Sequence, residues 1–308
     1  MSIERRHGAG REAALRDVEG KVAFITAGAS GIGYGMAQAF LNAGMKVVIA
    51  DILQQHLDEV AARHPGANNL HLIRLDVADR AAMEAAAEET ERVFGKVHVL
   101  CNNAGVASRG SIEDATYEDW DYVMGVCVGG TVNGLVNFLP KIRAHGEGGH
   151  VVNTSSMAGM IPVPGFVGTY STAKFAVRGM SDSLRLALAP HRIGVSVLCP
   201  GLVATRATTG GQVYRKAHDA EAIEATPPPI SGGMAPRAVG ERVLKGIQDN
   251  ELYIFPHGEF KDEVADYFQR MLDAFPPADG IDPERKAMEE RRAKMTAEQL
   301  AAADAIDN

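Results

Sequence analysis

The feature that most constrains the fold is a regular alternation of short apolar runs with longer segments of helical period, from about residue 20 to residue 255. The short runs are rich in Val, Ile and Leu, which is typical of strands buried on both faces. Repeated alternation of strand and helix predicts a mainly parallel sheet with helices on both faces, although the pattern does not give the order of the strands. Strands are expected at 21–26, 46–50, 70–75, 97–101, 150–154, 194–199 and 252–255, and helices at 35–43, 81–94 and 173–188.

Two stretches depart from this alternation. Residues 206–236 contain TTGG, TPPP and SGG, which interrupt regular structure and predict a long, mobile insertion. From Glu259 to Phe275 the apolar residues fall on one helical face, and the charged segment after PPADGIDP is expected to be a solvated helix or a frayed tail. We therefore expect one α/β domain, 18–256, with an N-terminal extension, 1–17, and a C-terminal helical extension, 257–308.

Composition disfavours several classes of protein. A net charge of −8 argues against nucleic acid or an anionic membrane as the main partner. The chain has no 18-residue uncharged apolar run, and its charged start does not resemble a secretory signal, so neither a membrane span nor export is predicted. Cys101, Cys127 and Cys199 are few and widely spaced, which favours a cytoplasmic protein over a disulfide framework or a zinc site. The ten histidines show no paired ligand spacing, so no metal is predicted.

The first expected strand runs into the glycine-rich turn TAGASGIG, residues 26–33, which opens a helix. Glycines at such a turn let backbone N–H groups approach a pyrophosphate, although glycine-rich turns are also common in structural loops. Asp51 lies 18 residues after Gly33, at the end of the second expected strand. A carboxylate there accepts the ribose hydroxyls of NAD and repels the extra phosphate of NADP, and neither Ile52 nor Leu53 supplies a cation for that phosphate. The alternative is a solvated carboxylate at a strand end, and NAD is the prediction.

Tyr170 and Lys174 are spaced by four residues, which places them one turn apart on one helical face. An ammonium beside a phenol stabilises the phenolate, and a phenolate can exchange a proton with an alcohol or carbonyl oxygen. Alone, the spacing favours a half-buried tyrosine beside a solvated lysine over a catalytic pair. The surrounding motifs decide between these interpretations.

Taken together, the motifs resemble the short-chain dehydrogenase/reductase family over about residues 18–255. The matching motifs are the turn 26–33, Asn102-Asn103-Ala104-Gly105, Ser155-Ser156, Tyr170-xxx-Lys174, and Pro200-Gly201 with Thr205. The resemblance implies a Rossmann-type, doubly wound sheet and an NAD-dependent oxidoreductase that interconverts an alcohol and a ketone. It implies proton exchange with the substrate oxygen by Tyr170, a nicotinamide-ribose contact and support of the phenolate by Lys174, and a hydrogen bond to the reacting oxygen from Ser156. Ser156 is preferred to Ser155 by alignment to Gly159.

The resemblance also implies which residues contact the cofactor. They are Gly28, Ser30, Gly31, Ile32, Gly33, Asp51, Asp76, Val77, Asn103, Ala104, Gly105, Tyr170, Lys174, Pro200, Gly201, Val203 and Thr205. The last four would flank the nicotinamide. Family habit further implies a homo-oligomer, a tetramer or a dimer.

The sequence departs from the family pattern in three places. Ala27 stands at the first motif glycine, where the following Gly28 is expected to relax the turn. The interval between Ser156 and Tyr170 is one residue longer than usual and rich in proline. Cys127 occupies the position of a catalytic asparagine, which holds a water that relays protons from the lysine, and a thiol is only a weak donor and acceptor. A rerouted relay, slow or lost catalysis with a retained nucleotide site, and a reactive thiol are the three interpretations. The last is disfavoured, because no cation neighbours Cys127 in the sequence.

The C-terminal part resembles the bacterial dehydrogenases that oxidise the benzylic Cα alcohol of lignin-derived β-aryl ethers. The shared features are the insertion before Met234, the run DNELYIFPHGEF and the helix with FQRMLDAFPP. This implies a bulky, apolar or aromatic secondary alcohol, with a pocket lined by 162–166, 206–236 and the added helix, although that helix could equally cover core or form a subunit interface. The alternatives are a carbonyl reductase for a steroid, terpenoid or cyclic ketone, and a catalytically weakened NAD-binding protein that serves in a complex or as a sensor.

Overall fold

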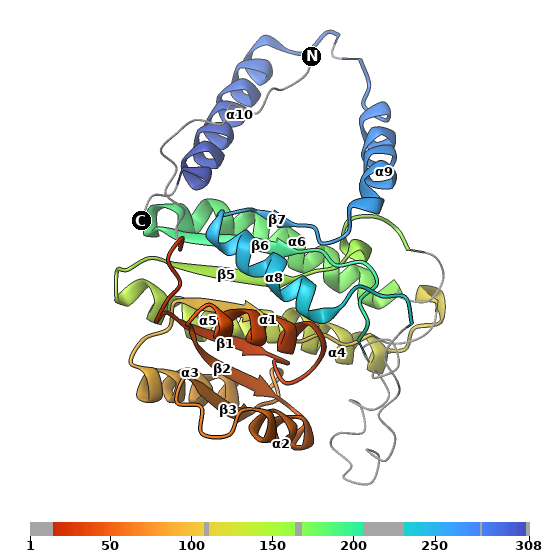
Figure 1. Ribbon diagram of the computed structural model, residues 1–308. Helices are drawn as coiled ribbons and strands as arrows, with labels where there is room; N and C mark the ends of the chain where they lie inside the picture. The colour runs from red at the N-terminus through yellow and green to blue at the C-terminus, as the bar shows by residue number, and fades with distance from the viewer. Residues whose placement is uncertain (1–14, 108–110, 164–167, 206–230, 278, 306–308) are drawn as a thin grey trace.

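The computed structural model describes residues 15–107, 111–163, 168–205, 231–277 and 279–305. Within them, seven strands form one parallel sheet in the order β3-β2-β1-β4-β5-β6-β7, with helices on both faces (Figure 1). The strands are β1 Val22–Thr26, β2 Lys46–Asp51, β3 Leu70–Arg74, β4 Val99–Asn102, β5 Gly149–Thr154, β6 Ile193–Leu198 and β7 Tyr253–Ile254. The expected doubly wound, Rossmann-type α/β fold is confirmed, and every expected strand is present.

Both faces of the sheet are buried, as the apolar runs predicted. In β1, Ala23 and Ile25 join one core cluster with Phe40, whereas Phe24 joins the other and stacks on Phe138 with ring centroids 4.3 Å apart. Successive residues of a strand face opposite sides, so a strand covered on both sides needs an unbroken apolar run. The helices are α1 Gly31–Asn42, α2 Gln54–Arg63, α3 Arg80–Phe94, α4 Tyr117–Met124, α5 Gly130–Ala144, α6 Gly168–Leu188, α8 Pro236–Gln248, α9 Lys261–Asp273 and α10 Pro283–Asp304.

The strand order reverses between β1 and β4, which are neighbours in the sheet. The connections that leave their carboxyl ends run in opposite directions, and a crevice opens where they part. Helices α1 and α6 begin at Gly31 and Gly168, earlier than the apolar periodicity indicated, because their first turns carry small and polar residues rather than apolar ones. The predicted site residues that follow the strands therefore gather at one edge of the sheet.

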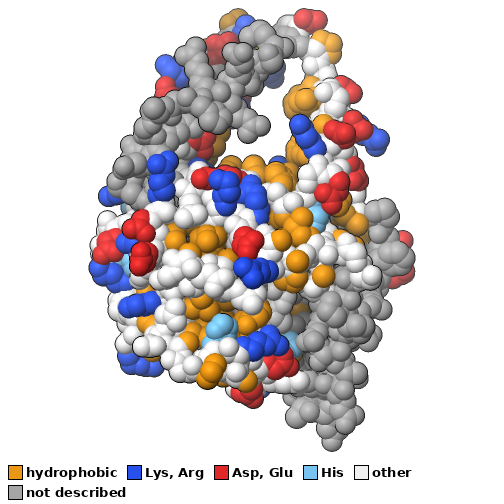
Figure 2. Space-filling model, viewed as in Figure 1, with side chains coloured by type: hydrophobic (Ala, Val, Ile, Leu, Met, Phe, Trp, Pro, Cys, Tyr) orange, Lys and Arg blue, Asp and Glu red, His pale blue; other side chains and the backbone are white. Residues whose placement is uncertain are grey.

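Two helices of the C-terminal extension project from the same side of the body (Figure 1). Near the start of α9, Phe260, Val264 and Phe268 pack on a cluster that includes Met157 and Met160. Figure 2 shows hydrophobic side chains on the part of α9 that extends away from the body. Those of Met271, Leu272 and Phe275 are 43%, 61% and 75% exposed. The added helix thus covers core with its first half only.

The charged C-terminal segment, expected to be a solvated helix or a frayed tail, forms α10. Its last turn is anchored to the body, because Arg185 donates to Asp304 at 3.0 Å and Asn250 donates to the Ala303 carbonyl at 3.1 Å. Arg185 is 1% exposed and also donates to Asn250, which joins α6, the turn before β7 and α10. Most of α10 is nevertheless exposed.

Several expectations fall partly outside the described residues. They include the insertion for 206–230, the N-terminal extension for 1–14 and the expected pocket lining for 164–166. Of the insertion, Met234 is described, and it pairs with Val203 by a parallel bridge before α8 begins at Pro236.

One helical stretch has the length and composition of a membrane span, which the sequence analysis did not identify. Residues 117–144 form one helical stretch of 28 residues, from α4 through a π-helical turn to α5. An 18-residue window within it has mean hydropathy 1.4, and length and composition alone would allow a span. Thr131 and Asn133 interrupt its apolar run in the sequence, which is why it was missed. In the fold both are buried, and Phe138 and Ile142 of the same stretch pack in the core.

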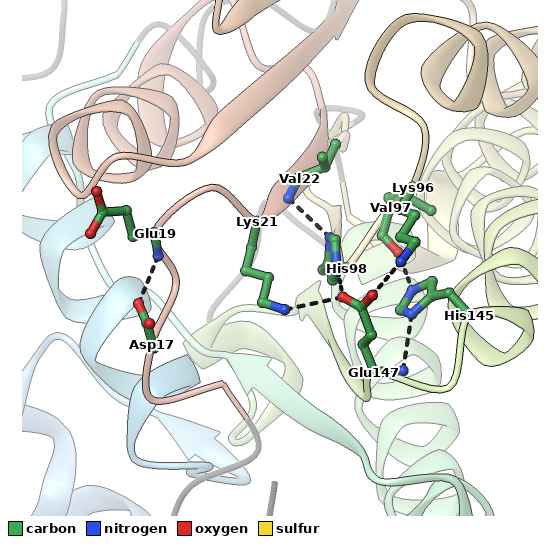
Figure 3. Close-up of polar contacts among 9 residues, drawn as sticks. All are labelled: Asp17, Glu19, Lys21, Val22, Lys96, Val97, His98, His145 and Glu147. Carbon is green, nitrogen blue, oxygen red and sulfur yellow. Dashed lines mark hydrogen bonds and ion pairs between the residues drawn. The ribbon is translucent and has the colours of Figure 1, made fainter.

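The amino ends of β1, β4 and β5 are joined by a network centred on Glu147 (Figure 3). Glu147 contacts Lys96, Lys21 at 3.2 Å and His98 Nε2 at 3.0 Å. These contacts hold the pKa of Glu147 well below its ordinary value, whereas burial lowers the pKa of His98. His98, His145 and Glu147 lie close enough together to suggest metal ligands, and sequence spacing did not reveal them. However, the Nδ1 atoms of His98 and His145 already accept backbone N–H groups, at 3.1 Å each. Lys21 and Lys96 also adjoin the Glu147 carboxylate. These contacts occupy the groups that a metal ion would need as ligands.

Candidate active site

Tyr170 and Lys174 lie one turn apart near the start of α6. Lys174 is 2% exposed, and its Nζ donates to the carbonyl of Thr154, at the end of β5, at 2.8 Å. The same Nζ lies 5.4 Å from the centroid of the Tyr170 ring, within cation–π distance. Tyr170 itself is partly exposed. The structure thus places a buried ammonium beside a phenol that solvent can reach.

The two serines after β5 have different environments. The Ser155 hydroxyl is fully buried and donates to the Lys174 carbonyl at 2.8 Å. Ser156 is partly exposed, and its hydroxyl lies 3.5 Å from the Pro200 carbonyl, at the limit of a hydrogen bond. Gly159 is in contact with this region, since a methyl group there would lie 2.4 Å from the Ser155 oxygen. The geometry favours Ser156 over Ser155 as the hydroxyl that can reach a substrate.

Cys127 lies in the π-helical turn Gly125–Gly129 between α4 and α5. Its thiol is 1% exposed, accepts from the Val106 N–H at 3.4 Å and donates to the Val106 carbonyl at 3.3 Å. A methyl group on Gly105 would lie 3.0 Å from Lys174 Nζ and 3.6 Å from Cys127 Sγ. The thiol and the ammonium therefore lie on the same side of the segment that follows β4. The π-turn, which often occurs at functional sites, lies beside them.

All three cysteines are buried and free. Burial raises the pKa of Cys199 to about 12 and raises that of Cys101 still further. A thiol that stays protonated is a poor nucleophile and a poor metal ligand. Neither of these two thiols is therefore a candidate for the reactive chemistry of the site.

The glycine turn after β1 corrects one expectation about Ala27. Ala27 itself adopts a positive φ of 48°, whereas Gly28 does not. The strain of replacing the motif glycine is thus carried by Ala27 and is not relaxed at Gly28. Gly28 is required for a different reason, since a methyl group there would lie 2.9 Å from the Ile25 carbonyl oxygen. At Gly33 a methyl group would meet the Ala27 carbonyl oxygen at 2.1 Å, so α1 packs directly on the turn.

A cavity of about 190 Å³ lies at the carboxyl ends of β1 to β4. Asp51, 3% exposed, borders it and accepts from the N–H groups of Ala29 at 3.2 Å and Leu53 at 3.1 Å. Burial raises the pKa of Asp51, and those hydrogen bonds together with His56 oppose the effect. The lining comprises Ala27, Asp51, Ile52, Leu75, Asp76, Val77, Ala78, Ala104, Gly105, Val106, Asp121, Tyr122, Gly125 and Val126.

Not all predicted cofactor residues line this cavity. Asp51, Asp76, Val77, Ala104 and Gly105 do. The predicted cofactor residues in the glycine turn, Asn103, and those in the segment after β6 lie outside its lining.

Asn103 acts as a brace between strand ends. Its amide donates to the Thr26 carbonyl at 3.1 Å, and its carbonyl oxygen accepts from the Thr154 hydroxyl at 3.3 Å. The Thr26 hydroxyl in turn accepts from the N–H groups of Asn103 and Ala104, both at 2.9 Å. The sequence analysis did not assign roles to Thr26 and Thr154. Their signal was position, because each is the last residue of a strand that leads into a predicted site loop.

The segment after β6 closes the other end of the site. The Pro200 carbonyl accepts from Met157 N–H at 2.9 Å, which holds this segment beside Ser156. Thr205 lies against the glycine turn, since a methyl group on Gly31 would be 3.1 Å from Thr205 Cγ2. The residues expected to flank a nicotinamide therefore lie between the glycine turn and Ser156.

Arg74 is a residue that sequence reasoning missed. It pairs with Asp51 in the β2–β3 register, and its Nε donates to the Ile52 carbonyl at 3.4 Å. The expectation that no cation lies near Asp51 was based only on Ile52 and Leu53, which follow it in sequence. The cation comes instead from Arg74, the last residue of the neighbouring strand β3.

A second, open hollow of about 410 Å³ lies beside the first turns of α6. Of the residues expected to line a substrate pocket, Pro162 and Val163 border this hollow. The others that border it are Ile112, Gly168, Ser171, Thr172 and Phe175. These side chains are mainly apolar or small. Gly168 and Ser171 lie on either side of Tyr170 in sequence, so the hollow adjoins the first turn of the helix that carries the phenol.

Comparisons with known proteins point to one family. Residues 21–212 match the sequence model described as short chain dehydrogenase. A C alpha-dehydrogenase of Sphingobium sp. is 36% identical over 279 residues, which cover 88% of this chain and 91% of that protein. The apo form of LigD from Sphingobium sp. strain SYK-6 has a TM-score of 0.72 and 36% identity, covering 85% of this chain and 100% of that one. A short chain dehydrogenase/reductase from Burkholderia phymatum in complex with NAD has a TM-score of 0.74 and 29% identity, covering 86% and 99%.

Proposed function

The chain belongs to the short chain dehydrogenase family, and on that premise we propose that it is an NAD-dependent oxidoreductase of bulky, apolar or aromatic secondary alcohols. The reaction removes a hydride from the carbinol carbon and a proton from the hydroxyl group, which leaves the ketone. The reverse reaction reduces the ketone through the same groups. The observation that carries the proposal is the buried Lys174 ammonium beside the accessible Tyr170 phenol, at the edge of the sheet where the glycine turn lies.

The residues present fit a dinucleotide. Gly31 and Gly33 leave the turn without side chains at the start of α1, where backbone N–H groups and the helix dipole favour a pyrophosphate. The cavity bordered by Asp51, Val77 and Ala104 would take the adenosine half, with the Asp51 carboxylate as acceptor for ribose hydroxyls. When bound, the nicotinamide supplies the acceptor for the hydride. The NAD complex of the Burkholderia phymatum relative supports this choice of cofactor.

The chain's own groups handle the proton and the orientation of the substrate. The Tyr170 phenolate would take the hydroxyl proton at its oxygen, and the Ser156 hydroxyl would donate a hydrogen bond to the same substrate oxygen. Lys174 keeps a positive charge beside the phenol, held in place by the Thr154 carbonyl at 2.8 Å. These fixed groups favour the charge that develops on the substrate oxygen in the transition state.

The substrate class rests on the apolar lining of the open hollow beside the helix that carries Tyr170. Pro162, Val163 and Phe175 border this hollow. Such a lining favours an aromatic or alicyclic substituent over a charged one. The similarity to a C alpha-dehydrogenase over 88% of the chain supports an aryl-substituted carbinol.

The test is a matched substrate panel. NADH or NADPH formation is measured with benzylic, alicyclic and short-chain secondary alcohols, and NADH or NADPH consumption is measured with cyclic ketones, for the wild-type protein and for Tyr170→Phe. We expect turnover of benzylic alcohols with NAD, and a loss of about 10³-fold in kcat with Tyr170→Phe. Turnover of cyclic ketones alone would instead support a carbonyl reductase. Measurable NADH binding without turnover of any substrate would support an NAD-binding protein without this activity.

A further inference from the structure

His257 opens the C-terminal extension and is 6% exposed. Both of its ring nitrogens contact the segment that follows β6. Its Nδ1 accepts from the Gly201 N–H at 3.0 Å, and its Nε2 lies 3.0 Å from the Leu202 carbonyl oxygen. Since Nδ1 is an acceptor and a carbonyl oxygen can only accept, Nε2 carries the proton and donates. One imidazole in one tautomer thus holds two consecutive residues of that segment.

The next turn reinforces this contact. Phe260 lies 6.2 Å from the His257 ring, centroid to centroid, at an interplanar angle of 75°. A methyl group on Gly201 would lie 2.5 Å from Phe260 Cε2 and 3.2 Å from His257 Cγ. The backbone of the segment is therefore pressed against the extension with no room for a side chain. This close approach, rather than a special backbone angle, requires glycine at position 201.

The opposite side of the segment is tied to the candidate active site. The Pro200 carbonyl accepts from Met157 N–H at 2.9 Å and lies 3.5 Å from the Ser156 hydroxyl. The Leu202 carbonyl has a second partner, the Met234 N–H at 2.9 Å, whereas His257 is the partner that fixes the Gly201 N–H. The Gly201 bond is therefore the contact that depends most on His257.

We propose that His257 is a positioning residue for hydride transfer. It sets the path of Pro200–Leu202 beside Ser156 and so fixes where the nicotinamide lies relative to the substrate carbon. This inference rests on the proposed function, and it gives the C-terminal extension a part in the reaction beyond covering core. Because hydride transfer depends steeply on the approach of the two carbons, a loosened segment should slow it far more than it weakens binding.

Three variants separate the two hydrogen bonds. His257→Leu removes both. His257→Asn can place an amide oxygen near the Nδ1 position and keep the Gly201 bond, whereas His257→Gln can place an amide N–H near Nε2 and keep only the Leu202 bond. Tyr253→Phe is the matched control, because it removes a partly buried 2.6 Å hydrogen bond to Asp182 in the same part of the chain without touching Pro200–Leu202.

For His257→Leu we expect kcat to fall about 10- to 100-fold, while the NAD dissociation constant rises less than about tenfold. The primary deuterium isotope effect on kcat should increase, since hydride transfer becomes more limiting. His257→Asn should recover kcat to within about threefold of wild type, and His257→Gln should not. Amide hydrogen exchange in the protein without NAD should accelerate at Gly201 in the Leu and Gln variants only.

The exchange measurement and NAD titration by calorimetry do not depend on the substrate class, so they decide the inference even if the proposed function fails. Unchanged exchange at Gly201 in His257→Leu would overturn it. So would a lower melting temperature with wild-type kcat and isotope effect, because that is the result of a purely structural role. An equal loss of kcat in Tyr253→Phe would show that general loosening around β7, and not the loss of the His257 contacts, is responsible.

Discussion

The thiol of Cys127 is bonded to both backbone polar groups of Val106, accepting from the N–H at 3.4 Å and donating to the carbonyl at 3.3 Å. Its single proton is committed to that carbonyl, and the side chain is 1% exposed. We infer that Cys127 ties the segment after β4 to the π-turn and does not relay protons during the reaction. This favours a route for protons that bypasses the thiol over a reactive cysteine.

The first prediction concerns that tie. In Cys127→Ala the N–H and carbonyl of Val106, itself 9% exposed, lose their partner, so the free energy of unfolding should fall by about 2 kcal/mol. Cys127→Asn restores a donor and an acceptor and should regain most of that stability, with NAD affinity near that of wild type. Denaturant unfolding and NAD titration measure both quantities.

The same Asn variant tests the proton route. We expect its turnover to differ from wild type in pH-dependent kinetics, because an amide beside Lys174 changes the local hydrogen bonding. A pH–rate profile that coincides with wild type would remove position 127 from the proton relay altogether.

A second prediction concerns Tyr170. Tyr170→Phe removes the phenol to which we assign the proton exchange, so kcat should fall by about 10³-fold, in the range of general acid–base effects. The NADH dissociation constant should stay within about threefold, since the ring and its contact with Lys174 remain. Tyr117→Phe is the control, because that phenol is 90% exposed and should leave kcat unchanged. A Tyr170→Phe enzyme with more than a tenth of wild-type kcat would exclude the assigned role.

Much of the fold could be predicted because buried parallel strands require apolar runs. In β1 the alternate residues Ala23 and Phe24 belong to opposite core clusters, and that requirement is local and visible in sequence. The order of the strands was not predictable, since no residue in β1 indicates that β4 rather than β3 is its neighbour. The start of α1 was also placed too late, because Gly31 and its neighbours lack the apolar period of a helix.

The site shows a similar division. Tyr170 and Lys174 are four residues apart on one helix, so their proximity follows from helical geometry. The acceptor for Lys174 is the backbone carbonyl of Thr154, and any residue type would offer the same atom. The His257–Gly201 hydrogen bond joins residues that are distant in sequence, and a histidine or a glycine at these positions does not by itself predict the contact. Contacts to backbone atoms across the fold are what the sequence could not reveal.

A third prediction follows from His150, which is fully buried in β5 and bonded to Ser196 at 2.7 Å. Burial, with a contribution from Arg185, lowers the pKa of His150 from 6.5 to about 3. The unfolded chain therefore binds this proton first as the pH falls, so the stabilising effect is full above pH 6.5 and is lost progressively toward pH 3. Over that window the free energy of unfolding should fall by about 1.4 kcal/mol per pH unit from this group alone.

His150→Gln should flatten this dependence, because the amide can keep a donor toward Ser196 and does not titrate. His191→Gln, at an exposed position, should leave the slope unchanged. Denaturant unfolding between about pH 4 and 7 measures the slope of the free energy of unfolding against pH in each variant. If His150→Gln shows the same slope as wild type, another group, such as the Glu147–His98 pair at the amino ends of the strands, accounts for the acid sensitivity.

A fourth prediction concerns the cofactor. Asp51→Asn removes the charge that we propose disfavours the extra phosphate of NADP, and Arg74 lies on the neighbouring strand at the same register position. We expect the NAD dissociation constant to rise about tenfold, through weaker ribose hydrogen bonds, and the NADP dissociation constant to fall. Adding Arg74→Ala should abolish the gain for NADP but not the loss for NAD. If NADP binding does not improve in Asp51→Asn, the carboxylate is not the source of discrimination.

The last prediction concerns the strained alanine in the glycine turn. Ala27 holds a φ of 48°, a region that costs a residue with Cβ about 1 kcal/mol or more. Ala27→Gly removes that strain but adds freedom to the unfolded chain, so we expect a net gain of about 0.5 kcal/mol in the free energy of unfolding. Ala29→Gly is the matched control two residues away, where φ is not positive and the methyl group is buried. That variant should lose stability, because it gains unfolded-state entropy and relieves no strain. If denaturant unfolding shows that both variants lose stability equally, the positive φ of Ala27 carries no strain and the family glycine is not needed at this turn.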